Sequence, residues 1–266
     1  MVSSGHAPHI VLDLEFDIVD DPQIRESIQQ EIIEIGAVKV DAKGAPIDTF
    51  DSLVKPQHCH GVAPIVHRLT GISWTDLSCS DPLPEVLERF HGWCGEGPTR
   101  MVTWSNSDKR QIKSECAFKG IKGTVDSLQW YDLQKTLRKA MHVKRDQLSL
   151  EDASLWFGVS PDEGHPHRAL YDAKATAELY SIFLGGDFSD CPGANTVRNK
   201  WGLAPEGCSD TIGNRASGLG NLLAELQKKE RHEAEARACA IATSAANVRQ
   251  GKISKQTAPR ARVTLS

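Results

Sequence analysis

Three carboxylates alternate along one short apolar segment near the N-terminus. The stretch HIVLDLEFDIVD, residues 9–20, carries Asp13, Glu15 and Asp17 at every second position. Side chains two apart on a strand share a face, so Asp13 and Glu15 project together while the intervening Leu and Phe side chains enter a core. Two carboxylates so close repel each other unless a cation lies between them, which favours a divalent metal. A solvated face of an edge strand is the alternative. Asp17, at the strand exit, is expected to be solvated or to lie in a turn.

Two later segments add acids in positions that suit the same chemistry. TWSNSDKRQI places Asp108 after a short apolar strand, in a polar turn that opens a helix, where an ordinary helix-capping acid is the alternative. HPHRALYDAKATAEL places Asp172 early in a helix. Small residues around it would let the helix backbone approach a sheet closely; these are Ala169, Ala173, Ala175 and Ala177.

His167 lies five residues before Asp172. Residues five apart lie on different faces of a regular helix. His167 is therefore expected on the loop that enters the helix, free to point into the same site. An isolated histidine is more often a surface residue, so the position by itself leaves both interpretations open.

The motifs together resemble a known family. DLEFD, TWSNSD and HRALYDA occur in that order, with EIIEIGAV and HRLTGIS between them. This set looks like the DEDDh 3′–5′ exonucleases of the RNase H-like fold, and within them most resembles the ERI-1 and KapD-like branch. The resemblance covers about residues 8–185. Phe16 stands where many relatives have Thr, a departure shared by the KapD-like branch.

The resemblance implies a fold, a metal site and a reaction. The fold would be α/β, a mixed five-stranded RNase H-like sheet flanked by helices. Two Mg²⁺ or Mn²⁺ ions would be held by Asp13, Glu15, Asp108 and Asp172. His167 would be the histidine of the subclass and, as general base, would take a proton from the water that attacks the terminal phosphodiester. The product would be a nucleoside 5′-monophosphate. Carboxylate ligands suit these ions better than zinc.

The resemblance also implies a substrate site for the 3′ end of single-stranded nucleic acid, with RNA preferred over DNA. Packing against the terminal nucleotide is expected from Phe16, Leu69, Thr70 and Ile72. Trp104 could stack on a base. Plain core packing is the alternative for Leu69, Ile72 and Trp104. A rival function is a KapD-like regulatory module that uses the fold for protein contacts, although protein partners are not indicated and the intact acid set counts against it.

The elements that must position these residues are visible in the hydrophobic pattern. Strands are expected at 10–16, in two runs within 31–56 joined at 41–44, at 100–106 and near 129–133. Helices are expected within 81–95, 107–120 and 168–186, and Ser149 is a candidate helix cap. Strands first, then alternating helices and strands, are typical of a mixed sheet covered by helices.

Composition sets the remaining expectations. The amino-acid composition changes near Gly186, after which Gly, Pro, Asn and Ser are frequent. This change predicts an exonuclease-like domain at 8–186 and an extension at 187–266, partly helical with a basic, disordered end. The net charge of −4 gives no global basic signature, so nucleic-acid contact must come from metal ions or local patches. Seven scattered cysteines favour free thiols, and HCH at 58–60 lacks a second ligand pair for zinc. No signal peptide or membrane-spanning run is visible, so a cytoplasmic location is expected.

Overall fold

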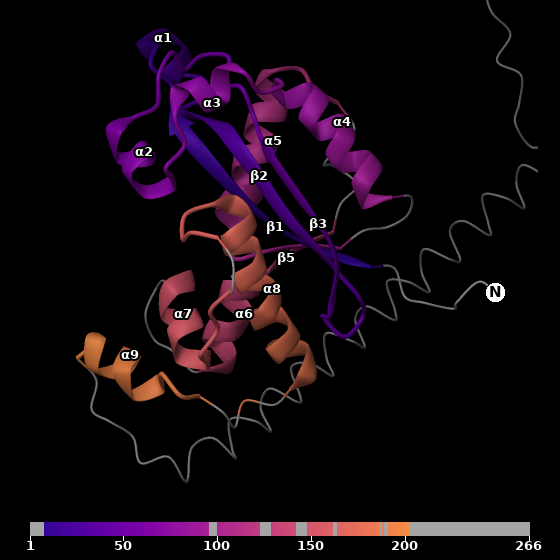
Figure 1. The fold of residues 1–266 in the computed structure, drawn as a ribbon, viewed down its shortest axis with the longest axis vertical. Helices are drawn as coiled ribbons and strands as arrows, with labels where there is room; N and C mark the ends of the chain where they lie inside the picture. The colour runs from indigo at the N-terminus through magenta and orange to yellow at the C-terminus, as the bar shows by residue number, and fades with distance from the viewer. Residues whose placement is uncertain are drawn as a thin grey trace, which may run out of the picture. The chain divides into compact units, whose positions relative to one another are not determined.

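A five-stranded mixed sheet in the order β3-β2-β1-β4-β5 runs through the centre of the fold (Figure 1). The structure is a computed structural model that describes residues 8–95, 100–122, 129–141, 148–161, 164–186, 188 and 191–202. The strands are β1 (His9–Ile18), β2 (Gln30–Val40), β3 (Pro46–Leu53), β4 (Arg100–Thr103) and β5 (Gln129–Asp132). β1 pairs antiparallel with β2 and parallel with β4. The strand that carries Asp13 and Glu15 is therefore central, which rules out the edge-strand alternative.

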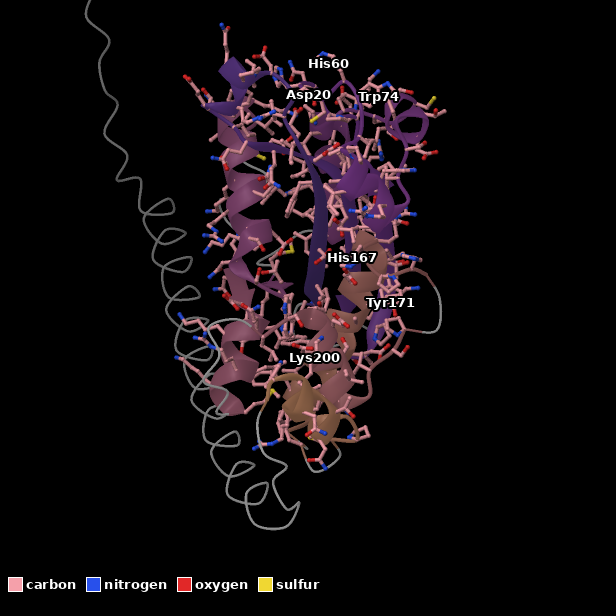
Figure 2. The ribbon with its side chains drawn as sticks, turned by 90° about the vertical axis from the view of Figure 1, so that its left-hand side faces the viewer. Asp20, His60, Trp74, His167, Tyr171 and Lys200 are labelled. Atoms are coloured by element: carbon pink, nitrogen blue, oxygen red, sulfur yellow. The ribbon has the colours of Figure 1, made fainter. Side chains whose placement is uncertain are left out.

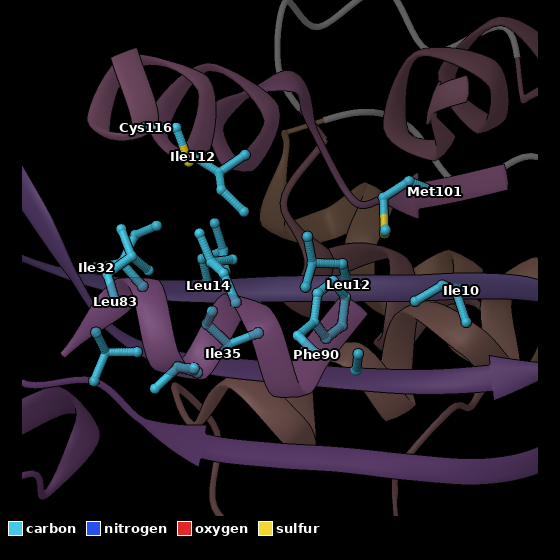
Figure 3. Close-up of a cluster of buried hydrophobic side chains, with 14 residues drawn as sticks. Ile10, Leu12, Leu14, Ile32, Ile35, Leu83, Phe90, Met101, Ile112 and Cys116 are labelled. Carbon is cyan, nitrogen blue, oxygen red and sulfur yellow. The ribbon is translucent and has the colours of Figure 1, made fainter. Parts of the chain in front are cut away.

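One face of the sheet packs against α4 (Leu83–Cys94) and α5 (Asn106–Phe118). Buried side chains from β1, β2 and β4 meet those of the two helices there, as Figure 3 shows. The cluster includes Ile10, Leu12, Leu14, Ile32, Ile35, Phe90, Met101 and Ile112. Alternation along β1 puts Leu12 and Leu14 into this core, so Asp13 and Glu15 face the opposite side.

The opposite face is covered by α8 (Ala169–Gly185), which contacts β1, β2 and β3. Its small residues Ala169, Ala173, Ala175 and Ala177 are all buried, as the sequence predicted for a close approach to the sheet. Gly36 of β2 is where the approach is closest. A Cβ atom at Gly36 would lie 2.1 Å from the carbonyl carbon of Ala169 and 2.1 Å from the amide nitrogen of Leu170. Only glycine fits at this position, which fixes the beginning of α8 against the sheet beside Asp13, the register partner of Gly36.

Asp17 lies just beyond a β-bulge between β1 and β2. Glu15 pairs with Glu34 and Phe16 pairs with Ile32, so Ile33 is an extra residue in β2. Asp17 is 1% exposed, and its carboxylate accepts hydrogen bonds from the backbone amides of Ile18 (2.7 Å) and Ala63 (2.9 Å). The expectation of a solvated Asp17 was wrong, because Ala63, directly before α2, approaches this end of the strand and donates its amide hydrogen bond.

Short helices complete the described part of the chain. They are α1 (Pro22–Arg25), α2 (Pro64–Thr70), α3 (Trp74–Ser78), α6 (Leu133–Ala140), α7 (Leu150–Phe157) and α9 (Ala194–Lys200). The sequence analysis did not predict α1, α2 or α3, although Pro64 at the start of α2 and the capping box of Ser73 and Asp76 are local signals for two of them. Ser149 caps α7, as expected. No helix in the described ranges is long and apolar enough to cross a bilayer.

The segment after Gly186 is described as far as residue 202. Within it, α9 contacts α7, where the Asp152 carboxylate accepts hydrogen bonds from Lys200 Nζ (2.6 Å) and Trp201 Nε1 (2.9 Å). The helix expected within the later part of the extension and the basic end both fall outside the described residues. The domain boundary at 186 stays a prediction. The five cysteines that the structure describes are free thiols, in agreement with the sequence analysis.

Candidate active site

Three carboxylates meet between the centre of the sheet and the beginning of α8. Oxygen atoms of Asp13, Glu15 and Asp172 all lie within 4.8 Å of one another. Asp13 and Glu15 come from the α8 face of β1, and Asp172 lies in the first turn of α8. Residues more than 150 positions apart in the sequence are thus brought together because Gly36 lets α8 dock directly behind them.

Asp108 is the fourth acid at this end of the sheet. It lies in the first turn of α5 and is 4% exposed. β4 ends at Thr103, opposite Leu12, so the amide of Leu14 has no β4 partner and donates a hydrogen bond to the Asp108 carboxylate instead. Asp108 is not within the three-residue group, yet its negative charge raises the pKa of Asp13. We call Asp13, Glu15, Asp108 and Asp172 the acidic site.

The acidic site is electrostatically strained without a cation. Burial, followed by the charges of Asp108 and Asp172, raises the pKa of Asp13 well above its usual value. Burial and the charge of Asp172 raise the pKa of Glu15 to about 8. Burial also raises the pKa of Asp108 to about 7, against the effect of its backbone hydrogen bonds. The pKa of Asp172 is raised by burial, and His167 opposes the shift.

A divalent cation is the ligand that this arrangement fits. Carboxylate oxygens are hard donors of the kind that Mg²⁺ and Mn²⁺ prefer, and no thiol or imidazole belongs to the group. A bound cation would offset the repulsion between the carboxylates that raises these pKa values.

The HCH segment at 58–60 does not form a metal site of this kind with any residue that the structure describes. Its Cys59 is buried, with its thiol 3.4 Å from the carbonyl oxygen of Ile18. Among the described residues, that segment contributes to no metal-ligating group.

His167 lies on the loop that enters α8, where the helical spacing predicted it. Figure 2 shows it next to the beginning of that helix, near Tyr171. It is exposed, and its φ of 65° is in the left-handed region, which non-glycine residues adopt uncommonly. Its backbone hydrogen bonds to the Asp172 carboxylate, so its position is coupled to the acidic site. An exposed imidazole beside a carboxylate cluster can accept a proton from a bound water.

Glu34 is a residue of this region that the sequence analysis missed. It is 0% exposed, is the register partner of Glu15, and its charge raises the pKa of Glu15. Its carboxylate accepts hydrogen bonds from Arg168 Nε (2.8 Å) and the amide of Ala169 (2.9 Å). The available signal was a pair of glutamates, Glu31 and Glu34, inside the otherwise apolar run EIIEIGAV.

The residues predicted to contact substrate have different exposures. Leu69 is 40% exposed at the end of α2, and Phe16 is partly buried against the core. Thr70 is buried, donating to the Val66 carbonyl (2.9 Å) and accepting from the Ile72 amide (3.0 Å). Ile72 is 2% exposed and packs with other buried side chains, and Trp104 is 7% exposed. The geometry therefore favours core packing for Ile72 and Trp104. Leu69 is the most exposed of these residues.

Sequence comparison identifies the family. The exonuclease family model RNase_T matches residues 10–180. A DNA polymerase III PolC-type from Caldanaerobacter subterraneus is 33% identical over 160 residues, which is 59% of this chain and 11% of that protein. The PolC-type polymerase of Thermotoga maritima is 31% identical over 184 residues, 68% of this chain and 12% of that protein. The chain thus spans about a tenth of the length of these curated relatives.

Solved structures share the fold at lower identity. A full-length 3′-exonuclease has a TM-score of 0.59 and 22% identity, covering 70% of this chain and 62% of its own. The nuclease domain of 3′hExo, a DEDDh family member bound to rAMP, has a TM-score of 0.57 and 23% identity, covering 69% and 94%. Exonuclease I of E. coli in complex with a dT13 oligonucleotide has a TM-score of 0.53 and 14% identity, covering 66% and 41%. With its RNase H-like sheet and its match over residues 10–180, the chain belongs to the RNase_T exonuclease family.

Proposed function

We propose that this protein is a metal-dependent 3′–5′ exonuclease that hydrolyses the terminal phosphodiester bond of single-stranded nucleic acid. Nucleoside 5′-monophosphates would be released. The observation that carries the proposal is the convergence of Asp13, Glu15 and Asp172 within 4.8 Å, with buried Asp108 beside them. Four acids with raised pKa values destabilise a fold unless a cation is bound, so their retention fits a metal-dependent reaction.

The roles follow from the positions of the side chains. Asp13, Glu15, Asp108 and Asp172 would hold two ions, Mg²⁺ or Mn²⁺, which would supply an activated water and stabilise the leaving 3′-oxygen. His167 is proposed as the general base, because it is exposed beside Asp172 and can carry the proton of the attacking water into solvent. The 3′-terminal nucleotide is proposed to pack on Leu69 and Phe16, whereas Thr70, Ile72 and Trp104 are buried and offer it little surface.

The substrate is proposed to be RNA in preference to DNA, by resemblance to the ERI-1 and KapD-like branch. Structural neighbours described with rAMP and with a histone mRNA stem-loop support this. DNA is the second candidate, because the curated relatives are DNA polymerases and another neighbour was solved with dT13. The regulatory-module alternative is not favoured, because a fold used only for protein contacts gains nothing from four mutually repelling acids, of which three are half-buried and Asp108 is buried.

Matched oligonucleotides test the proposal directly. Purified protein with Mn²⁺ or Mg²⁺ should shorten a 5′-labelled single-stranded RNA in a ladder that grows from the 3′ end, and shorten the DNA of the same sequence more slowly. A 3′-phosphorylated or 3′-blocked oligonucleotide and a reaction with EDTA are the controls. Degradation that begins at the 5′ end, or that continues in EDTA, would contradict the proposed reaction. A faster DNA ladder would reverse the sugar preference alone.

The proposed role of His167 predicts a specific pH effect. His167→Ala should lower kcat by roughly 10²–10⁴-fold, the usual contribution of a general base. The wild-type rate should fall at acidic pH as the base becomes protonated, and the residual rate of His167→Ala should lack this fall. Both profiles are measured at saturating metal, so that any titration of the carboxylates is common to the two proteins. A wild-type rate and profile in His167→Ala would rule out the role.

A further inference from the structure

β2 carries two fully buried glutamates, and their partners differ. Glu31 accepts hydrogen bonds from the amides of Gln57 and His58 and pairs with Lys119 Nζ at 2.6 Å. These partners lie at the other side of the bulge, away from α8. Glu34 instead pairs with Arg168 and Ala169 at the beginning of α8. A buried carboxylate is tolerated only when its oxygens are paired, so each glutamate holds its partners firmly.

Glu34 replaces the missing cap of α8. Arg168 is the N-cap residue and makes no side-chain capping bond, which would leave the Ala169 amide as an unpaired donor. One oxygen of Glu34 accepts from that amide at 2.9 Å, and the other accepts from both Nε and a terminal nitrogen of Arg168. A side chain of the sheet, 135 residues before Ala169, therefore caps the N-terminal end of the helix.

The same contacts hold the turn that presents His167. Arg168 is fixed on both sides, since its amide donates to the His165 carbonyl (3.1 Å) and its carbonyl accepts from the Asp172 amide (3.0 Å). His167, directly before it, is in the left-handed region that the surrounding contacts must maintain. Gly36, two residues from Glu34, lets the helix backbone rest on β2 at the same place. A loss of the Glu34 contacts would release the residue next to His167.

We propose that Glu34 is a positioning residue for the reaction: by pairing with Arg168 and Ala169 it sets the place of the His167 imidazole relative to the acidic site. This inference rests on the proposed role of His167. Glu34 does not touch substrate or a bound ion in this account, because both of its oxygens are already engaged. Its effect is on geometry, and a displacement of about 1 Å at a reacting group can lower a rate on the order of 10²-fold.

Two isosteric variants on the same strand test the role. Glu34→Gln keeps an acceptor for Ala169 but presents an amide group that cannot accept from Arg168. We expect kcat to fall roughly 10–100-fold, while KM and the affinity for Mn²⁺, measured by titration, change less than about threefold. Glu31→Gln removes a buried charge of the same kind from the same strand, and should lower the melting temperature with kcat within about twofold of wild type. If Glu34→Gln does not fold, Arg168→Lys tests the same contact.

A double variant separates positioning from a general structural effect. In the His167→Ala background, Glu34→Gln should cause no further loss of kcat, because it acts only through that histidine. Independent, multiplicative losses, or a weakened Mn²⁺ affinity in Glu34→Gln, would overturn the proposal. A wild-type rate in His167→Ala would overturn both this inference and the proposed base. An unchanged kcat in Glu34→Gln beside an impaired His167→Ala would overturn the role of Glu34 alone.

Discussion

Asp13→Asn is expected to abolish nuclease activity and, in metal-free buffer at about pH 8, to make the protein more stable than wild type. Asp13 lies at the centre of the acidic site, and its pKa is raised by burial and by four neighbouring carboxylates. Asparagine has the same shape as aspartate but carries no negative charge. It therefore neither holds a divalent cation nor repels the neighbouring carboxylates. The variant should therefore lose at least about 10³-fold in rate, because the metal is needed for both the attacking and the leaving oxygen.

The pH dependence of stability follows from the direction of the shifts. In the folded, metal-free protein the pKa values of Glu15 and Asp108 are about 8 and about 7, well above those of the unfolded chain. Between about pH 4 and about pH 8 the folded state thus binds more protons than the unfolded state. The free energy of unfolding must then fall as the pH rises through this window. Asp13→Asn removes part of the effect, so its melting temperature should fall less steeply.

Thermal melts in EDTA from about pH 5 to about pH 8 measure this difference. At about pH 8 the free energy of unfolding of Asp13→Asn should exceed that of wild type by roughly 1–3 kcal/mol. This corresponds to a melting temperature higher by roughly 2–10 °C. Saturating Mn²⁺ should stabilise wild type and leave Asp13→Asn nearly unchanged. Equal slopes of stability against pH in the two proteins would show that the carboxylates do not repel one another in solution.

Asp17→Asn is the matched control on the same strand. Asp17 is buried, as Asp108 is, whereas Asp13, Glu15 and Asp172 are half-buried. Both oxygens of Asp17 accept backbone hydrogen bonds, and it lies outside the carboxylate group. An amide there leaves one backbone donor unpaired, so the variant should lose roughly 1–3 kcal/mol of stability in the same melts while keeping its activity at low temperature. The expected change in stability is thus a gain for Asp13→Asn and a loss for Asp17→Asn. This difference distinguishes a functional acid from a structural one.

Local patterns were enough to predict the central parts of the fold and site. Alternation along β1 correctly placed Leu12 and Leu14 in the core and the acids on the other face. The run of small residues around Asp172 correctly predicted a helix packed closely on the sheet. These signals succeed because the pleat of a strand and the turn of a helix are set by the residues themselves.

Features that depend on distant partners were not predictable in this way. The burial of Asp17 involves a hydrogen bond from the Ala63 amide, 46 residues away, which no residue of β1 indicates. The role of Glu34 depends on Arg168, 134 residues later. An acid in an apolar strand can be a metal ligand, a cap for another element or half of an ion pair, and only its partners distinguish these uses.

Gly36→Ala is the second substitution from which we expect a large effect, although it removes no functional group. The added methyl group would lie 2.1 Å from two backbone atoms of α8, and backbone cannot move aside as the end of a flexible side chain can. The beginning of α8 must therefore shift away from β2. Asp172 and the His167 turn would move with it, relative to Asp13, which pairs with Gly36 across the sheet.

The expected loss is in both stability and rate. Overpacking of this kind destabilises a fold by about 1–3 kcal/mol or more, which would lower the melting temperature by roughly 2–10 °C. The displacement of the acidic site should reduce kcat on the order of 10²-fold even well below that temperature. Mn²⁺ titration should show weaker binding as well, since Asp172 is separated from Asp13 and Glu15. This distinguishes the variant from Glu34→Gln, for which metal affinity is retained.

Gly92→Ala provides the same chemical change where there is room for it. Gly92 lies inside α4, nothing is within 4 Å of an added Cβ, and alanine favours a helix by up to about 1 kcal/mol over glycine. This control should melt slightly higher than wild type and keep its rate. If Gly36→Ala behaved like Gly92→Ala in melting, kcat and Mn²⁺ affinity, the close contact of α8 with β2 could not be what holds the two halves of the acidic site together.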